Sequence, residues 1–190
     1  MNYAEISAKV ADWINRGDLS ARIPDFIALA EERMNRALRV RQMETSLAAT
    51  AITNNLITPA ADVLDVKALW VPNYERTPLK PQGLESVIAG GYQGTPTMYA
   101  WDGADLRFDG AGDVQGVLYA RIPALATAST NWVSEGSWSL YLWGALMEAS
   151  LFVKNATEAA TWEGRFLQVM DEIRGNEQRR AGPMVARARL

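Results

Sequence analysis

Histidine and cysteine are both absent from this sequence of 190 residues. Histidine is the commonest general base near neutral pH, and cysteine supplies the thiol nucleophile. Together the two side chains provide most of the ligands in transition-metal sites. Their absence predicts a chain with no catalytic residue, no metal site and no bound cofactor, so we expect that it is not an enzyme.

The residues that remain form none of the common catalytic motifs. The serines lack a Gly-x-Ser-x-Gly motif and have no histidine to activate them. The glycine-rich segment Gly90–Thr95 lacks the Gly-Lys-Ser/Thr ending of a phosphate-binding loop. The spacing of a calcium loop is not matched by the four aspartates Asp102, Asp105, Asp109 and Asp113. The sequence does not fix the distance between any two carboxylates, so a glycosidase-type pair stays open.

Long hydrophobic runs are absent as well. The longest, Leu140–Val153, is shorter than the roughly 20 residues of a transmembrane helix, and it contains Glu148. The first residues show no basic stretch followed by an apolar run. We therefore expect no signal peptide and a soluble protein of a cytosol-like compartment.

The charge of the chain is divided unevenly. Residues 174–190 contain five arginines and one glutamate, a charge of +4. Because the net charge is −3, residues 1–173 carry −7. Such a basic end favours an acidic partner surface, and a solvated, frayed terminus is the alternative interpretation.

Helical periodicity occurs at both ends of the sequence. Apolar residues recur with helical spacing over 3–15, from Pro24 to about Arg39, over 137–154 and over 155–175. The third of these segments has Glu148 as its only charged residue between Trp138 and Val153. A helix that is apolar on nearly every side must be covered on most of them, so we expect a neighbouring subunit to cover part of it.

The middle of the chain has the pattern of strands. Short segments rich in β-branched or aromatic residues are bounded by Gly, Pro and Asp, at 46–50, 63–71, 97–101, 105–109 and 114–122. The dipeptide Asp102-Gly103 between two of them predicts a hairpin with a two-residue turn. A short helical turn is expected over 84–89.

These patterns predict an α+β fold. Its core is a four-helix bundle formed by the N- and C-terminal helix pairs, residues 1–44 and 132–175. A β-rich antiparallel insertion, residues 45–131, lies between the second and third helices. Residues 176–190 form an extended, basic C-terminal tail.

Several short motifs follow one another along most of the chain. They are Asp25–Glu31 with Arg33, Arg36 and Leu38-Arg39; Pro59-Ala60 with Asp62–Leu64; Gly94–Pro96 with Tyr99; Tyr119, Ile122-Pro123 and Leu125; Asn131-Trp132; and Leu140–Leu142 with Ala145-Leu146 and Glu148-Ala149. In this order they resemble the head–tail adaptor (connector) proteins of tailed bacteriophages.

The resemblance implies a structural virion protein. Such adaptors form a ring, typically twelvefold, beneath the portal at one capsid vertex, where they extend the DNA channel and dock the tail. The implied partners are the portal protein, a tail or nozzle protein and further copies of the chain. Packaged DNA passes through without specific binding, and no membrane is involved. The implied location is the head–tail junction at the portal vertex of the virion, and the host cytoplasm during assembly.

Within this resemblance, two sets of residues are candidate sites. We expect the basic tail to bind acidic groups of the portal through Arg179, Arg180, Pro183, Arg187, Arg189 and Leu190. We expect contacts between subunits of the ring at Arg33, Arg36, Trp138, Tyr141 and Trp143.

A second class of function stays open at this point. Aromatic side chains stack on sugar rings and are enriched in protein interfaces. The chain could accordingly be a non-enzymatic binding module whose aromatic β-insertion recognises a glycan or a protein partner.

Overall fold

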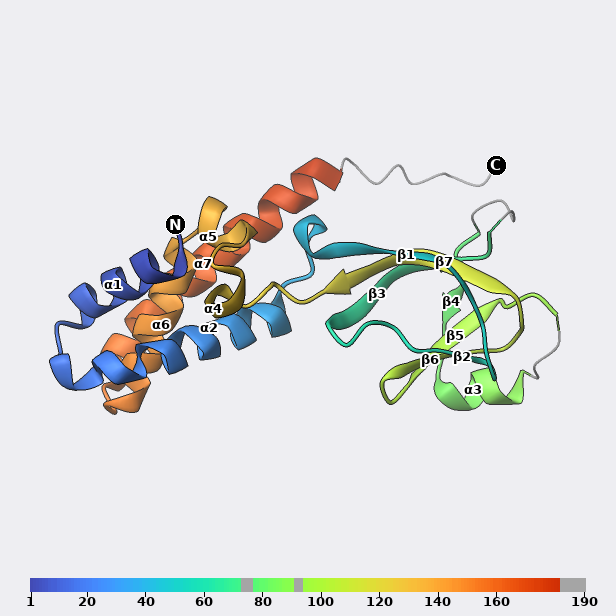
Figure 1. The fold of residues 1–190 in the computed structure, drawn as a ribbon, viewed down its shortest axis with the longest axis horizontal. Helices are drawn as coiled ribbons and strands as arrows, with labels where there is room; N and C mark the ends of the chain where they lie inside the picture. The colour runs from blue at the N-terminus through green and yellow to red at the C-terminus, as the bar shows by residue number, and fades with distance from the viewer. Residues whose placement is uncertain (73–76, 91–93, 182–190) are drawn as a thin grey trace. The chain divides into compact units, whose positions relative to one another are not determined.

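The computed structural model describes residues 1–72, 77–90 and 94–181. The chain divides into two compact units (Figure 1). We call residues 1–42 and 122–190 the helical unit, and residues 43–121 the β unit. The α+β class expected from the sequence is confirmed. The borders between the units fall after residues 42 and 121, whereas the sequence predicts them after residues 44 and 131.

The described part of the helical unit contains the four long helices expected from the periodicity, together with shorter ones. In chain order the helices are α1 (Tyr3–Ile14), η1 (Gly17–Arg22), α2 (Ile23–Ala37), η2 (Arg41–Met43) at the border, α4 (Leu125–Ala128), α5 (Trp132–Gly136), α6 (Ser139–Phe152) and α7 (Ala156–Ala181). The short helices were not predicted because such segments contain too few residues to show a hydrophobic period.

Capping residues set several helix ends. Asn2 and Glu5 form a capping box at the start of α1, and Asn131 and Ser134 form one at the start of α5. The C-cap of α1 is Asn15, whose φ of 46° lies in the left-handed region that asparagine tolerates.

Helix α7 is longer than the sequence predicts. Gly175 suggests an end at that position, but the helix continues to Ala181, so the first residues of the predicted extended tail are helical. The salt bridge between Glu177 and Arg41, at 3.5 Å, helps to hold this part of α7 against the N-terminal half of the unit. Such contacts offset the cost of about 1 kcal/mol of a glycine inside a helix. The rest of the predicted tail, 182–190, lies outside the described residues.

Helix α6 is the central helix of the helical unit, in contact with α1, α2 and α7 (Figure 1). Gly144 permits this close packing, since a Cβ atom there would lie 2.7 Å from the Cβ of Ala30 and 3.1 Å from the ring of Phe166. Every residue from Leu140 to Ser150 except Trp143 is buried. The chain itself therefore covers most of α6, and a neighbouring subunit is not needed to cover these residues. The exposed large apolar side chains of α6 are Leu151 and Phe152.

The described residues of the β unit form two sheets (Figure 1). The first has the order β1 (Glu44–Ala51), β7 (Asp113–Ala120), β3 (Val63–Trp70), and the second has the order β2 (Leu56–Ile57), β6 (Asp105–Phe108), β5 (Met98–Asp102), β4 (Lys80–Pro81). The predicted hairpin joins β5 to β6, but its two-residue turn is Gly103-Ala104 and not Asp102-Gly103, because Asp102 belongs to β5 and pairs with Asp105. Gly103, at φ 66°, takes the left-handed position of this turn.

One strand pair departs from the expected antiparallel insertion. Strand β4 pairs with β5 in parallel, so the second sheet is mixed. Parallel neighbours need a crossover connection. Helix α3 (Leu84–Ala89), which the sequence predicts as a helical turn, lies in that connection.

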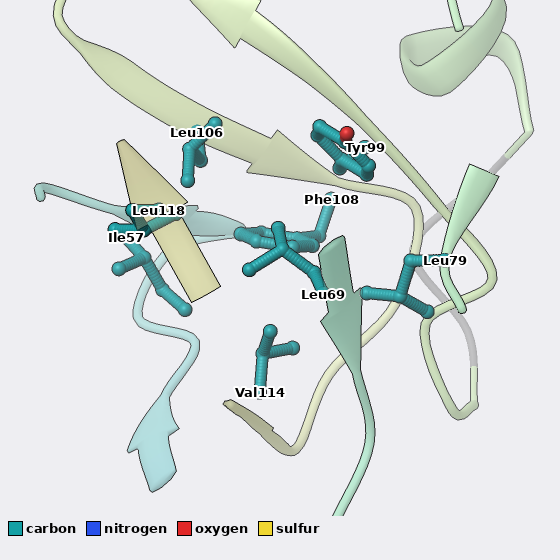
Figure 2. Packing of buried hydrophobic residues seen from close by; sticks show 8 residues of the cluster. All are labelled: Ile57, Leu69, Leu79, Tyr99, Leu106, Phe108, Val114 and Leu118. Atoms are coloured by element: carbon teal, nitrogen blue, oxygen red, sulfur yellow. The ribbon is translucent and has the colours of Figure 1, made fainter. Parts of the chain in front are cut away.

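Both sheets contribute to the core of the β unit. Figure 2 shows its buried side chains, which are Ile57, Leu69, Leu79, Tyr99, Leu106, Phe108, Val114 and Leu118. Phe108 is fully buried, and its ring centroid lies 6.5 Å from that of Tyr99. The β unit thus has a hydrophobic core of its own.

We predict opposite effects for the same substitution at two helical glycines. Gly144→Ala places a methyl group against Ala30 and should lower the free energy of unfolding by about 1–2 kcal/mol, because overpacking outweighs the gain in helix propensity. Gly164→Ala in α7 meets no atom within 4 Å and should raise it by about 0.5–1 kcal/mol. Urea unfolding measures both changes in the free energy of unfolding. Equal effects at the two sites would contradict the close packing of α6 at Gly144.

Candidate assembly surface

A polar network joins α2 to residues 122–131, the first segment of the helical unit after the β unit. The carboxylate of Glu31 accepts a hydrogen bond from the backbone N–H of Leu125 at 2.7 Å and one from the hydroxyl of Tyr141 at 3.1 Å. The side-chain amide of Asn131 donates to the same hydroxyl oxygen at 2.7 Å. These side chains come from α2, α6 and the returning segment, so the network holds the three together.

Two further contacts join α2 to the same elements. Asn35, one turn along α2, accepts a hydrogen bond from the backbone N–H of Ile122 at 2.8 Å. Arg33 forms a salt bridge with Glu148 of α6. The side chain of Glu148 is only 9% exposed. A buried charge needs an oppositely charged partner, and Arg33 is that partner on the central helix.

Burial changes the acid–base behaviour of this network. It raises the pKa of Glu31, while the hydrogen bonds from Leu125 and Tyr141 lower it by a smaller amount. Burial also raises the pKa of Tyr141 well above its usual range. The phenol therefore keeps its proton at neutral pH and still donates a hydrogen bond to Glu31. We interpret this hydrogen bond as a structural contact.

The residues predicted for the subunit interface belong to two helices: Arg33 and Arg36 lie on α2, Tyr141 and Trp143 lie on α6, and Trp138 is the N-cap residue of α6. Arg36 is exposed and pairs with Glu32 at 3.7 Å. Tyr141 is fully buried, so its side chain offers no surface to a neighbour in this structure. Trp138 lies beneath Lys9, whose ammonium nitrogen is 5.6 Å from the ring centroid. That these residues contact a neighbouring subunit is a proposal.

Three tryptophans from three helices form what we call the tryptophan cluster: Trp13 of α1, Trp143 of α6 and Trp162 of α7. The rings of Trp143 and Trp162 are stacked, with centroids 5.5 Å apart. Trp13 meets both rings edge-on, at 5.2 Å and 5.8 Å, and is 53% exposed. Arg165 lies over the ring of Trp143 at 5.5 Å. Each ring belongs to a segment that the helical spacing predicts as a helix, over 3–15, 137–154 and 155–175, but that spacing does not reveal that the three rings meet here.

A groove of about 360 Å³ lies between α2 and α7 and is called the α2–α7 groove below. Its lining is formed by Arg33, Arg36, Ala37, Met147, Glu163, Phe166, Leu167, Met170 and Arg174. Leu167 is 49% exposed there. The sequence predicted Arg33 and Arg36 as interface residues but missed the α7 side, although its members recur with helical spacing over 163–174.

The residues predicted to bind the portal lie at the C-terminal end. Arg179 is exposed at the end of α7, and its Nε donates to the carbonyl oxygen of Gly175 at 3.3 Å. The backbone of Arg180 belongs to the same helix. Pro183, Arg187, Arg189 and Leu190 lie outside the described residues.

Three of the aspartates of the hairpin region have structural partners. Asp109 accepts hydrogen bonds from the backbone N–H groups of Thr97 and Met98, at 2.8 and 2.9 Å. Asp102 pairs with Arg107, and Asp105 accepts from Thr58. Within the described ranges, no three acidic, histidine or cysteine side chains gather into a group that could hold a metal ion. No helix of that same part of the chain combines the length and the apolar character needed to cross a membrane.

Comparison with known proteins identifies one family. The model of the family described as SU10 adaptor protein matches residues 1–187. No curated protein matches the chain. The family match confirms the resemblance to phage adaptor proteins that the ordered motifs indicate, and it extends over both the helical unit and the β unit.

We predict that Glu31 makes stability depend on pH. Its pKa is higher in the folded chain than in the unfolded chain, so folding favours the protonated form. The free energy of unfolding, compared with that of Glu31→Gln, should therefore fall as pH rises from about 4, the unfolded pKa, through the raised value. Urea titrations between pH 4 and pH 7 measure the difference. The matched control is Glu32→Gln, an exposed neighbour on α2, and an equal pH dependence in both variants would contradict the prediction.

Proposed function

The chain belongs to the SU10 adaptor protein family, and from this premise we propose that it forms a ring that joins the portal of a tailed phage to the tail and extends the DNA channel. Membership of the family gives the chain a structural role in a phage virion. The observation that carries the finer proposal is the extent of the match, which includes both units and all four long helices.

The helical unit supplies the contacts between subunits in this proposal. A closed ring of identical chains needs two different surfaces on each chain, because each subunit meets one neighbour on either side. The tryptophan cluster and the α2–α7 groove are two such surfaces. They include Trp143 in the cluster, and Arg33 and Arg36 beside the groove. Twelve copies match the expected symmetry of the portal vertex.

The β unit favours passage of DNA without specific binding. Residues 43–121 contain nine acidic and five basic side chains, a net charge of −4. Negative charge repels the phosphate backbone, so a channel wall of this composition does not retain an exiting duplex.

The partners of the proposed ring are the portal and the tail. Portal acids bind the basic C-terminal end, because opposite charges at an interface speed association and select the partner. A tail or nozzle protein binds the completed ring. The location is the portal vertex of the virion, reached after assembly in the host cytoplasm.

A second candidate function is recognition of a glycan or protein by the β unit. The observation that favours it is a groove of about 460 Å³ whose lining includes Pro59, Val63 and Trp101. Trp101 is 37% exposed, as a stacking platform requires. A shift of tryptophan fluorescence on adding glycans, absent in Trp101→Ala, would support this candidate.

Negative-stain microscopy of the protein with the portal of its own phage tests the proposed function. Rings seated on the portal, with one chain for each portal subunit, are the expected result. Single chains that do not associate with the portal at micromolar concentration would refute the adaptor ring and leave the β-unit groove as the site to pursue.

We predict that removing residues 182–190 abolishes binding to the portal while the thermal midpoint stays within a few degrees. The deletion leaves α7 and its salt bridge between Glu177 and Arg41 in place, so the helical unit keeps its packing. Two full-length variants test whether binding depends on positive charge at Arg187 and Arg189. Replacing both with Lys should preserve binding to the portal, and replacing both with Gln should weaken it. Undiminished binding of the truncated chain would show that the portal contact lies elsewhere.

A further inference from the structure

The groove of about 460 Å³ in the β unit, called the β-unit groove here, is a surface that the proposed ring leaves without a partner. We infer that it binds an extended, proline-containing segment with a basic residue, and that the tail protein supplies this segment. The inference rests on the proposed function for the source of the segment. It deepens that function, since it names the surface on which the ring receives the tail.

Two parts of the chain that are distant in sequence form the groove. Residues 58–64, which include the motif Pro59-Ala60 with Asp62–Leu64, form one side, and the hairpin between β5 and β6 forms the other. Four residues of the lining are alanine or glycine, so they leave the space beside Trp101 open; they are Ala60, Ala61, Gly103 and Ala104. An open hollow beside an aromatic ring is suited to a side chain from a partner.

A β-bulge contributes Leu64 to the lining. The register between β3 and β7 skips Leu64, which lies between the paired residues Val63 and Asp65. A bulge changes the direction of a side chain relative to regular strand alternation, and bulges are frequent beside functional sites. Strand β3 is also an edge strand of its sheet. The bulge therefore adds a large apolar side chain to the groove at an edge that an extended segment can reach.

The chemistry of the lining favours a protein segment over a glycan. Apart from the indole of Trp101, Thr58 is the only residue among the described lining residues whose side chain can form a hydrogen bond. Its hydroxyl already donates to the carboxylate of Asp105 at 2.6 Å. A sugar presents many hydroxyl groups, and a site that selects it needs several polar side chains directed at them. The lining offers apolar contact instead.

Trp101 has the properties that recognition of a proline-containing segment requires. The side chain is 37% exposed, and no hydrogen bond occupies its indole N–H in the described part of the chain. Proline-rich segments bind in aromatic-lined grooves as polyproline II helices, whose carbonyl groups have no internal partner and can accept such an N–H. Because these segments are already extended in the free state, they lose little conformational entropy on binding.

The charges at the border of the groove select a basic partner. Asp62 is exposed between the lining residues Ala61 and Val63, and within the described ranges neither Asp62 nor Asp105 forms a salt bridge. Arg121, whose backbone N–H donates to the carbonyl of Asp62 at 2.7 Å, still leaves one acid in excess. A lysine or arginine beside the apolar part of the segment complements this excess.

Overlapping synthetic peptides that cover the tail proteins of the same phage test the chemistry of the ligand. Fluorescence anisotropy measures their binding to the full-length chain. We expect the peptides that bind to contain proline together with lysine or arginine, and Trp101→Ala to weaken their binding at least about tenfold. Absence of binding, or bound peptides that lack proline or a basic residue, would overturn the inference.

A second variant keeps the test valid if Trp101→Ala disturbs folding. Ala104 is exposed at the hairpin turn, so Ala104→Arg fills the hollow without changing the core and repels a basic ligand. Binding should again fall at least about tenfold. The matched control is Ala49→Arg, at an exposed alanine of β1 outside the lining, which should bind like the parent chain. Equal affinities of the two variants would contradict the assignment of the groove.

The charge argument has its own isosteric test. Asp62→Asn should weaken peptide binding about twofold to fivefold and reduce its dependence on salt, because an exposed ion pair contributes little and is screened. Asp113→Asn, at an exposed acid of β7 outside the lining, is the control and should change neither quantity. Parental affinity and salt dependence in Asp62→Asn would show that the groove selects no basic residue.

Competition with glycans and assembly on the portal separate the remaining outcomes. Binding of host-surface oligosaccharides, but of no peptide, would replace the inference by glycan recognition. Rings of Ala104→Arg should sit on the portal and fail to hold the tail protein. If they hold it as the parent rings do, the inference is wrong and the proposed function stands. Peptide binding that requires Trp101, in chains that never associate with the portal, would support the groove and refute the adaptor ring.

Discussion

The helical unit depends on one partly buried acceptor, the carboxylate of Glu31. It receives the backbone N–H of Leu125 and the hydroxyl of Tyr141, and so joins a helix made before the β unit to a loop and a helix made after it. Leaving such donors unpaired in a buried place costs about 1–3 kcal/mol each. Because this contact fixes the register of α2 against α6, the close approach at Gly144 and the salt bridge from Arg33 to Glu148 follow from it.

The range of the interactions explains what the sequence could and could not reveal about the fold. Long helices were predicted because an apolar stripe repeats over several turns, and the hairpin was predicted because Asp102-Gly103 is a specific turn signal. The extension of α7 beyond Gly175 depends on contacts such as that of Glu177 with Arg41, which local sequence does not contain. The parallel pairing of β4 depends likewise on a crossover through α3.

The candidate site was predicted in part, for a related reason. A helical period shows that a side of a helix is apolar, but it does not show whether the same chain or a neighbour covers that side. Tyr141 was therefore assigned to the surface between subunits, although it is buried inside its own unit. Arg33 and Arg36 were recognised as charges beside an apolar stripe, and the structure places both at the groove. The α7 half of that groove became visible only with the tertiary structure.

The central position of α6 also has a consequence for how the chain folds. Helices α1 and α2 leave the ribosome first, but the helix that they cover follows the whole β unit, residues 43–121, which takes about 4–16 s to synthesise at 5–20 residues per second. During that time Phe26 and Ile27 have no partner in α6. Antiparallel pairing of Glu44 with Tyr119 shortens the wait, because it brings the two ends of the β unit together. Once the β unit has folded, it acts as a short connection between the two parts of the helical unit. The entropic cost of closing a long loop then no longer opposes the docking of α6.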